Sequence, residues 1–211
     1  MLIKSFGCSF ISGTDLADAY NVWPSLIAHK LGINFKNCAF GGIGNQRILA
    51  ELLKELGEND NEEVFYIIQW TWQDRFDYVD DNNHWQTCRP SLDTKSAAIY
   101  FKNFHSSFID TLRSLSCIYT AIEILKTNNI PFVMTAIDDL IWQAADATFF
   151  HPASLTVLQN RIEPFIKYFD GMDFLTWSRQ HNFAESKLWH PLDDAHQAAA
   201  EYVIKNWALG I

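Results

Sequence analysis

The alternation of short apolar runs with segments of helical period limits the fold of this chain more than any other feature. Four runs have the length and composition of buried strands: Leu2 to Phe6, Ile33 to Ala39, Val64 to Trp70 and Pro131 to Ile137. Apolar residues recur at helical spacing in Val22 to Leu31, Asn45 to Leu56 and Phe104 to Asn128, and a last helix is expected to open at Asp193 or Asp194 and run toward Asn206. This order predicts an α/β fold with a parallel sheet covered on both faces.

The composition fits one globular domain over residues 1–211. Hydrophobic residues make up 48% of the chain and charged residues 19%, which excludes a disordered chain or a fibre. The net charge of −9 predicts no nucleic-acid partner, because a phosphate backbone would be repelled. No apolar run is long enough for a membrane span. The sequence leaves the oligomeric state open.

The cysteines and the N-terminus favour a cytoplasmic protein. Cys8, Cys38, Cys88 and Cys117 are widely spaced and match no zinc or CxxC pattern, which suits free thiols in a reducing compartment. The first residues lack the basic start and long apolar stretch of a signal peptide.

One long segment, residues 74–95, lacks clear periodicity. It combines aromatic side chains, turn-forming residues and five acidic residues against three basic ones. A stretch of that length within a small domain is usually functional, so we interpret it as a lid or insertion. The alternative is a disordered surface insertion.

Polar and glycine residues follow the first three predicted strands. Ligands bind beyond the carboxyl ends of parallel strands, so the loops that hold Ser9, the Gly41–Gly44 turn and Gln73 should converge on one crevice. A serine there becomes a nucleophile only with a base within hydrogen-bond reach. Backbone N–H groups of a glycine-rich turn could stabilise an oxyanion.

Two histidines near the C-terminus are candidates for that base. His190 precedes Pro191 and is therefore biased away from helix, into a loop, whereas His196 falls in the first turn of the last predicted helix. A loop histidine is the better base, because a helical residue shares its orientation with the packing face. Residues of the types that bind metals also gather in the C-terminal half: Asp138, Asp139, His151, His181, His190, Asp193, Asp194 and His196. No fixed ligand spacing links them, so we expect no metal and no cofactor.

Together these residues resemble the SGNH (GDSL-type) hydrolases. The resemblance runs from Ser5 to Tyr202 and rests on four blocks: Gly7-Cys8-Ser9, Trp23-Pro24, Asn37 followed five residues later by Gly42, and His190-Pro191 ahead of an alanine-rich helix. It implies a flavodoxin-like three-layer fold and ester hydrolysis through an acyl-serine. It assigns Ser9 as nucleophile, Gly42 as an oxyanion donor and His190 as base.

The chain departs from the family pattern at three points. Cys8 stands where the family commonly has Asp, and the third block lacks its oxyanion asparagine, for which Gln73 or Asn45 could substitute. Lys187 occupies the usual position of the triad acid, so the acid comes from elsewhere, with Glu185 nearest in sequence, or a backbone carbonyl orients the imidazole. The runner-up pair is Asp193 and His196, which form a literal DxxH.

The predicted function is hydrolysis of a small O-acyl ester, with a carbohydrate as one candidate for the alcohol part. Large flat side chains could stack on a sugar ring or an acyl chain, although many should pack in the core: Trp70, Trp72, Tyr78, Trp85, Trp142, Trp177 and Trp189. The alternative is a catalytically weak or inactive glycan-binding module with the same fold.

Overall fold

A computed structural model describes residues 1–58, 63–92, 94–138 and 152–211. Its strands are β1 (Leu2–Gly7), β2 (Asn34–Asn37), β3 (Val64–Trp70), β4 (Phe76–Val79), β5 (Trp85–Cys88) and β6 (Phe132–Ala136). Its helices are α1 (Ser9–Ser12), α2 (Trp23–Leu31), α3 (Asn45–Gly57), α4 (Lys95–Asn103), α5 (Ser107–Thr127), α6 (Pro152–Ile162), α7 (Phe174–Gln180) and α8 (Asp193–Asn206).

The central sheet is parallel, with the strand order β2-β1-β3-β6. Its register pairs Leu2 of β1 with Asn34 of β2 on one side and with Val64 of β3 on the other. After β1 the chain forms β2 on one side of β1 and then β3 on its other side. The loops after β1 and β3 therefore flank the switch point of the sheet, where α/β folds of this kind bind ligands.

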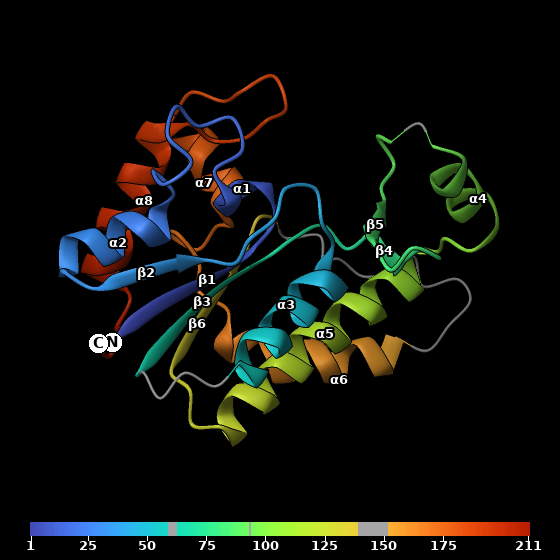
Figure 1. Ribbon diagram of the computed structural model, residues 1–211, viewed down its shortest axis with the longest axis horizontal. Helices are drawn as coiled ribbons and strands as arrows, with labels where there is room; N and C mark the ends of the chain where they lie inside the picture. The colour runs from blue at the N-terminus through green and yellow to red at the C-terminus, as the bar shows by residue number, and fades with distance from the viewer. Residues whose placement is uncertain (59–62, 93, 139–151) are drawn as a thin grey trace.

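Helices cover both faces of this sheet in three layers. Helices α1, α2, α7 and α8 lie on one face, and α3, α5 and α6 lie on the other (Figure 1). The central strands are buried along nearly their whole length and therefore need both faces covered: β3, for example, is buried from Phe65 to Trp70. The predicted α/β architecture is confirmed.

The segment expected to be irregular has regular structure. Strands β4 and β5 form an antiparallel hairpin, pairing Phe76 with Cys88 and Val79 with Trp85. With α4 the hairpin stands apart from the three layers at one end of the molecule (Figure 1). A second small apolar cluster, separate from the main core, explains why it folds: Cys88, Ala97 and Tyr100 are buried against Phe76, Tyr78, Leu92 and Phe101. We call β4, β5 and α4 the hairpin unit.

Among the described residues, no helix has both the length and the apolar character needed to cross a lipid bilayer.

Candidate active site

Ser9 lies at the start of α1, directly beyond the end of β1. The helix follows the strand so closely because residue 7 is glycine: a Cβ there would stand 2.7 Å from the Ile11 side chain and 2.9 Å from the Gln69 carbonyl oxygen. Ser9 is 5% exposed, and its hydroxyl lies 4.0 Å from the Cys8 sulfur. Beyond α1 the chain turns back through Asp15, whose φ is +68°.

The glycine turn after β2 is held from the side of the hairpin unit. The buried Asp77 carboxylate accepts hydrogen bonds from the backbone N–H groups of Gly44 and Arg47, both at 2.9 Å. The Arg75 guanidinium donates to the Ile43 carbonyl at 2.9 Å. Gly42 has a φ of +77°, a conformation that favours glycine. The turn is thereby fixed next to the segment that follows β3.

The two carboxamide candidates both reach the region after β3, and both already have partners. Asn45 is 2% exposed; its Oδ1 accepts from the Thr71 N–H at 2.9 Å, and its Nδ2 donates to the Thr71 carbonyl at 3.0 Å. Gln73 is half-buried, and its Oε1 accepts from the Thr111 hydroxyl at 2.6 Å. Each amide nitrogen retains at least one further hydrogen for an oxyanion.

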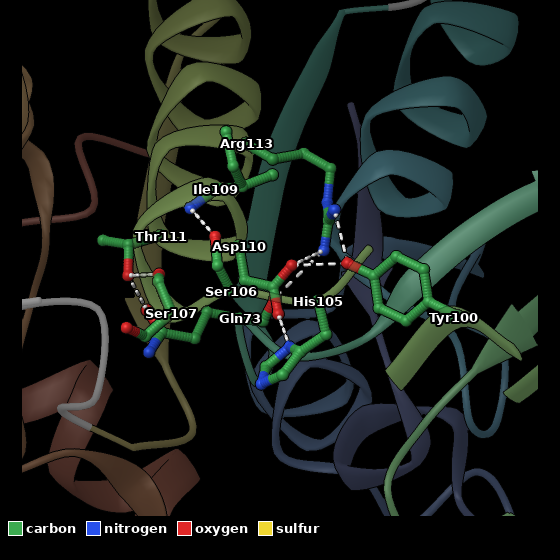
Figure 2. A network of polar contacts seen from close by, with 9 residues as sticks. All are labelled: Gln73, Tyr100, His105, Ser106, Ser107, Ile109, Asp110, Thr111 and Arg113. Atoms are coloured by element: carbon green, nitrogen blue, oxygen red, sulfur yellow. Dashed lines mark hydrogen bonds and ion pairs between the residues drawn. The ribbon is translucent and has the colours of Figure 1, made fainter. Parts of the chain in front are cut away.

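A polar network anchors Gln73 and the hairpin unit to α5 (Figure 2). The Asp110 carboxylate is fully buried and accepts from the Tyr100 hydroxyl, from His105 Nδ1 at 2.7 Å and from Arg113 Nη2 at 2.7 Å. Burial, together with the hydrogen bond to Asp110, raises the pKa of Tyr100 to about 12. The network is therefore a structural support behind the loop after β3.

His190 has a carboxylate partner, which is Asp15. His190 Nδ1 and Asp15 Oδ2 are 2.7 Å apart, and the imidazole is 9% exposed. A carboxylate only accepts hydrogen bonds, so Nδ1 carries the hydrogen and Nε2 is left with a lone pair. This is the tautomer that a general base needs.

Ser186 holds the two partners together. Its hydroxyl donates to Asp15 Oδ2 at 2.7 Å and accepts from the backbone N–H of His190 at 3.3 Å. The hydrogen bonds from Ser186 and then His190 hold the pKa of Asp15 below its usual value, despite some opposing desolvation. Asp15 is therefore ionised at neutral pH.

The Phe10 ring places His190 beside the start of α1. It meets the imidazole edge to face, with 5.3 Å between the centroids. His190 thus contacts the residue that follows Ser9 and bonds the carboxylate six positions beyond Ser9. The structure contains no hydrogen bond between the described side chains of Ser9 and His190.

Glu185, the nearest acid before His190 in the sequence, is bonded to another residue. Its carboxylate accepts from Arg179 at 2.8 and 3.2 Å, which turns it toward α7. The group bonded to the imidazole is the Asp15 carboxylate and not a backbone carbonyl.

The alternative pair, Asp193 and His196, is not joined by a hydrogen bond. Asp193 Oδ1 accepts from the Asn21 amide at 2.8 Å, while His196 Nδ1 accepts from the Trp23 N–H at 3.2 Å. His196 is 1% exposed, and desolvation lowers its pKa to about 4. It is a neutral histidine of the core, and its spacing from Asp193 reflects one turn of helix.

The remaining candidates are scattered. Within the described ranges, no group of three or more His, Cys, Asp or Glu residues is placed to hold a metal ion; Asp139 and His151 lie outside them. Trp70 and Trp177 belong to the core, and Trp142 lies outside the described residues. Trp189, by contrast, is 64% exposed next to His190.

Sequence reasoning missed Asp15 and Ser186. The local signals were weak: an Asp two residues after Gly13, and a serine four residues before His190. Nothing in the sequence relates one position to the other, because 171 residues separate them.

Comparison with known proteins gives structural neighbours only. No family model matches this sequence, and no curated protein matches it closely enough to be a relative. Solved structures do match. A lipolytic G-D-S-L family member from Veillonella parvula has a TM-score of 0.57 at 13% identity, covering 98% of both chains. The psychrotrophic esterase EstA from Pseudoalteromonas sp. has a TM-score of 0.57 at 12% identity, covering 98% of this chain and 97% of that one.

A carbohydrate esterase family 2 enzyme from Corynascus thermopiles has a TM-score of 0.53 at 16% identity, covering 97% of this chain and 64% of that one. Identities this low establish a shared fold and no more. The protein has the fold of the G-D-S-L (SGNH) hydrolases, as the sequence resemblance predicts.

Proposed function

We propose that this protein, with its SGNH-hydrolase fold, is a serine esterase that hydrolyses a small O-acyl ester through an acyl-serine intermediate. Ser9 is the nucleophile, His190 the general base, and Asp15 the acid that orients the imidazole. The observation that carries the proposal is the contact between Asp15 and His190, beside the helix that begins with Ser9. Nucleophile, base and orienting carboxylate are the parts that acyl transfer requires.

The chemistry follows from these positions. His190 Nε2 takes the proton of the Ser9 hydroxyl as Oγ attacks the ester carbonyl. The negative charge that develops on the carbonyl oxygen is stabilised by the Gly42 N–H and by an amide hydrogen of Asn45 or Gln73. The imidazolium then protonates the departing alcohol, and water hydrolyses the acyl-serine by the reverse proton path.

The hydrogen bond between Ser9 and His190 must form when substrate binds. Catalytic hydrogen bonds are often long or poorly aligned before substrate is bound. The 4.0 Å contact from the Ser9 hydroxyl to the Cys8 sulfur is weak and easily exchanged for a bond to nitrogen.

The substrate is proposed to be small, and a sugar-borne acyl group is the favoured form. One structural neighbour is a carbohydrate esterase. The exposed Trp189 offers a flat face for a sugar ring next to the base.

The test is turnover of 4-nitrophenyl acetate by Ser9→Ala. We expect kcat to fall by roughly 10³-fold or more, because the covalent route is lost. Ser12→Ala is the matched control, since this serine lies in the same helix and its hydroxyl bonds Thr14. Equal activity of Ser9→Ala and the wild-type protein contradicts the proposal.

A second candidate, a glycan-binding module without turnover, is favoured by the exposed Trp189 and by the missing bond between Ser9 and His190. It predicts that a xylo-oligosaccharide quenches Trp189 fluorescence while no ester is hydrolysed. Ester turnover that depends on Ser9 excludes it.

A further inference from the structure

The Arg89 guanidinium lies against Gly42, the proposed oxyanion glycine. A Cβ built on Gly42 would stand 3.0 Å from Arg89 Nη1 and 3.6 Å from Cζ. The absence of a side chain at residue 42 is therefore what allows the guanidinium to approach the backbone of the turn. Arg89 directly follows β5, so the hairpin unit places this positive charge beside Gly42.

This positive charge has no negative partner among the described residues. Arg89 is half-buried, and neither a hydrogen bond nor an ion pair to its guanidinium occurs within the described ranges. Asp77, the buried acid of the hairpin, already accepts hydrogen bonds from the Gly44 and Arg47 N–H groups and from the Thr87 hydroxyl.

Each of the other five arginines has a hydrogen-bond or ion-pair partner for its guanidinium, which makes Arg89 unusual: Arg47, Arg75, Arg113, Arg161 and Arg179. Arg113 bonds Asp110 at 2.7 Å, and Arg179 bonds Glu185 at 2.8 Å. In a chain with nine more acidic than basic residues, carboxylates are abundant. A half-buried guanidinium with five unused donors is suited to a planar anion from outside.

The glycine turn also lies close to the segment that contains α1, the helix that begins with Ser9. A Cβ on Gly41 would stand 3.1 Å from the Thr14 hydroxyl oxygen and 3.9 Å from the Ser12 hydroxyl oxygen. Thr14 and Ser12 follow Ser9 by five and three residues. The turn therefore lies between the Ser9 segment and Arg89.

From this arrangement we infer that Arg89 binds a carboxylate carried by the ester substrate, close to the carbonyl that Ser9 attacks. The inference rests on the proposed esterase function and narrows its substrate class to esters with an anionic group. The carboxylate belongs either to the acyl part, as in a half-ester of a dicarboxylic acid, or to the alcohol part, as in an acetylated hydroxy acid or uronic acid. A guanidinium binds either one through two parallel hydrogen bonds.

The experiment compares isosteric substrate pairs in which only the charge differs. Monoethyl succinate and ethyl levulinate test the acyl side, and 4-acetoxybenzoate and 4-acetoxyacetophenone test the alcohol side. The measured quantity is the ratio of kcat/KM for the anionic ester to kcat/KM for its neutral partner. Wild-type protein, Arg89→Gln, Arg89→Lys and Ser9→Ala are compared. The matched control is Arg161→Gln, since Arg161 bonds the Tyr119 hydroxyl on the other face of the sheet.

For one pair, the wild-type ratio is expected to exceed one, and Arg89→Gln should lower it roughly 10- to 100-fold. Arg89→Lys should lower it less, and Arg161→Gln should leave it unchanged. The pair that responds identifies the side that carries the carboxylate.

The inference is overturned if neutral esters are hydrolysed in a manner that depends on Ser9 but, for both pairs, the ratio of kcat/KM values is the same in Arg89→Gln as in the wild-type protein. If no ester is hydrolysed, or hydrolysis persists in Ser9→Ala, the esterase function itself fails and the inference falls with it. The neutral esters and Ser9→Ala keep the two failures distinct.

Discussion

Asp15 and His190 are separated by 175 positions in the sequence, yet 2.7 Å separates Oδ2 of the one from Nδ1 of the other. The contact links the turn after α1 to the loop before α8. It gives the proposed base a fixed tautomer and an ionised partner, although the sequence position where this fold family usually has its acid is Lys187. The proposed catalytic carboxylate thus lies near the start of the chain, far in sequence from the histidine that it orients.

Asp15→Asn tests the proposed acid. Asn tolerates the left-handed backbone at residue 15, so the fold should persist. An amide can offer a hydrogen where the carboxylate accepted one, which favours the wrong imidazole tautomer, and kcat should fall by about 10³-fold. Steady-state turnover of 4-nitrophenyl acetate measures it. Glu185→Gln is the control and should change kcat by less than about 3-fold, since its carboxylate faces Arg179. A larger loss in the control than in Asp15→Asn would return the role to Glu185.

His190→Ala and His196→Asn should differ sharply in kcat. His190→Ala, which removes the proposed base, should lower kcat by about 10³-fold. This loss should not add to the loss in Ser9→Ala, because Ser9 and His190 act as a unit. His196→Asn keeps an acceptor for the Trp23 N–H and should have nearly wild-type turnover. The opposite ranking would show that the DxxH pair carries the chemistry.

The pH dependence of the free energy of unfolding should show that His196 is buried as a neutral imidazole. Its pKa is about 4 in the folded protein against 6.5 in the unfolded chain, so between these values the unfolded chain binds more protons. Stability should therefore fall as the pH drops from 6.5 toward 4, by about 3 kcal/mol in total from this group, and should not change above 6.5 on its account.

Urea unfolding of wild-type protein, His196→Asn and His29→Asn at pH 7.5, 5.5 and 4.5 measures this effect. His29 is exposed and serves as the control. The difference between wild-type protein and His196→Asn should shift with pH, and the difference between wild-type protein and His29→Asn should stay constant. A constant difference for both variants would mean that His196 is not buried as a neutral group.

Asp77→Asn should uncouple the hairpin unit from the glycine turn. Its carboxylate accepts three hydrogen bonds in a buried position, and the amide would set an N–H against at least one donor. We expect a loss of about 2 kcal/mol in the free energy of unfolding and a raised KM. Asp81→Asn, at the exposed hairpin tip, is the control for urea unfolding and ester kinetics. Equal stability of the two variants would mean that Asp77 does not fasten the turn.

Most of the fold could be predicted from the sequence because buried parallel strands and amphipathic helices have strong sequence patterns. Val64–Trp70 is the clearest case, where the predicted and observed strands coincide. The hairpin was not foreseen because β4 and β5 are only four residues long and lie among acids and turn formers. Their stability comes from Tyr100, which stacks on Phe76 at 4.4 Å and belongs to a later helix.

Of the proposed site residues, local sequence patterns indicate those that stand at the ends of strands and helices. Ser9, Gly42 and His190 are placed by the ends of elements or by Pro191, which local patterns can report. Asp15 is placed by a tertiary contact to His190 and Ser186, so no local pattern could find it. The spacing of Asp193 and His196 misled for the converse reason, since residues three apart on a helix need not bond each other.

Covalent labelling shows whether Ser9 is a nucleophile activated by His190. The protein is treated with diethyl 4-nitrophenyl phosphate, and the adduct is located by peptide mass spectrometry. We expect one diethylphosphoryl group on the Ser9 hydroxyl, release of 4-nitrophenolate in equal amount, and labelling that is at least about 10²-fold slower in His190→Ala. An unlabelled Ser9 peptide, or equal labelling rates in the two proteins, would contradict the proposed mechanism.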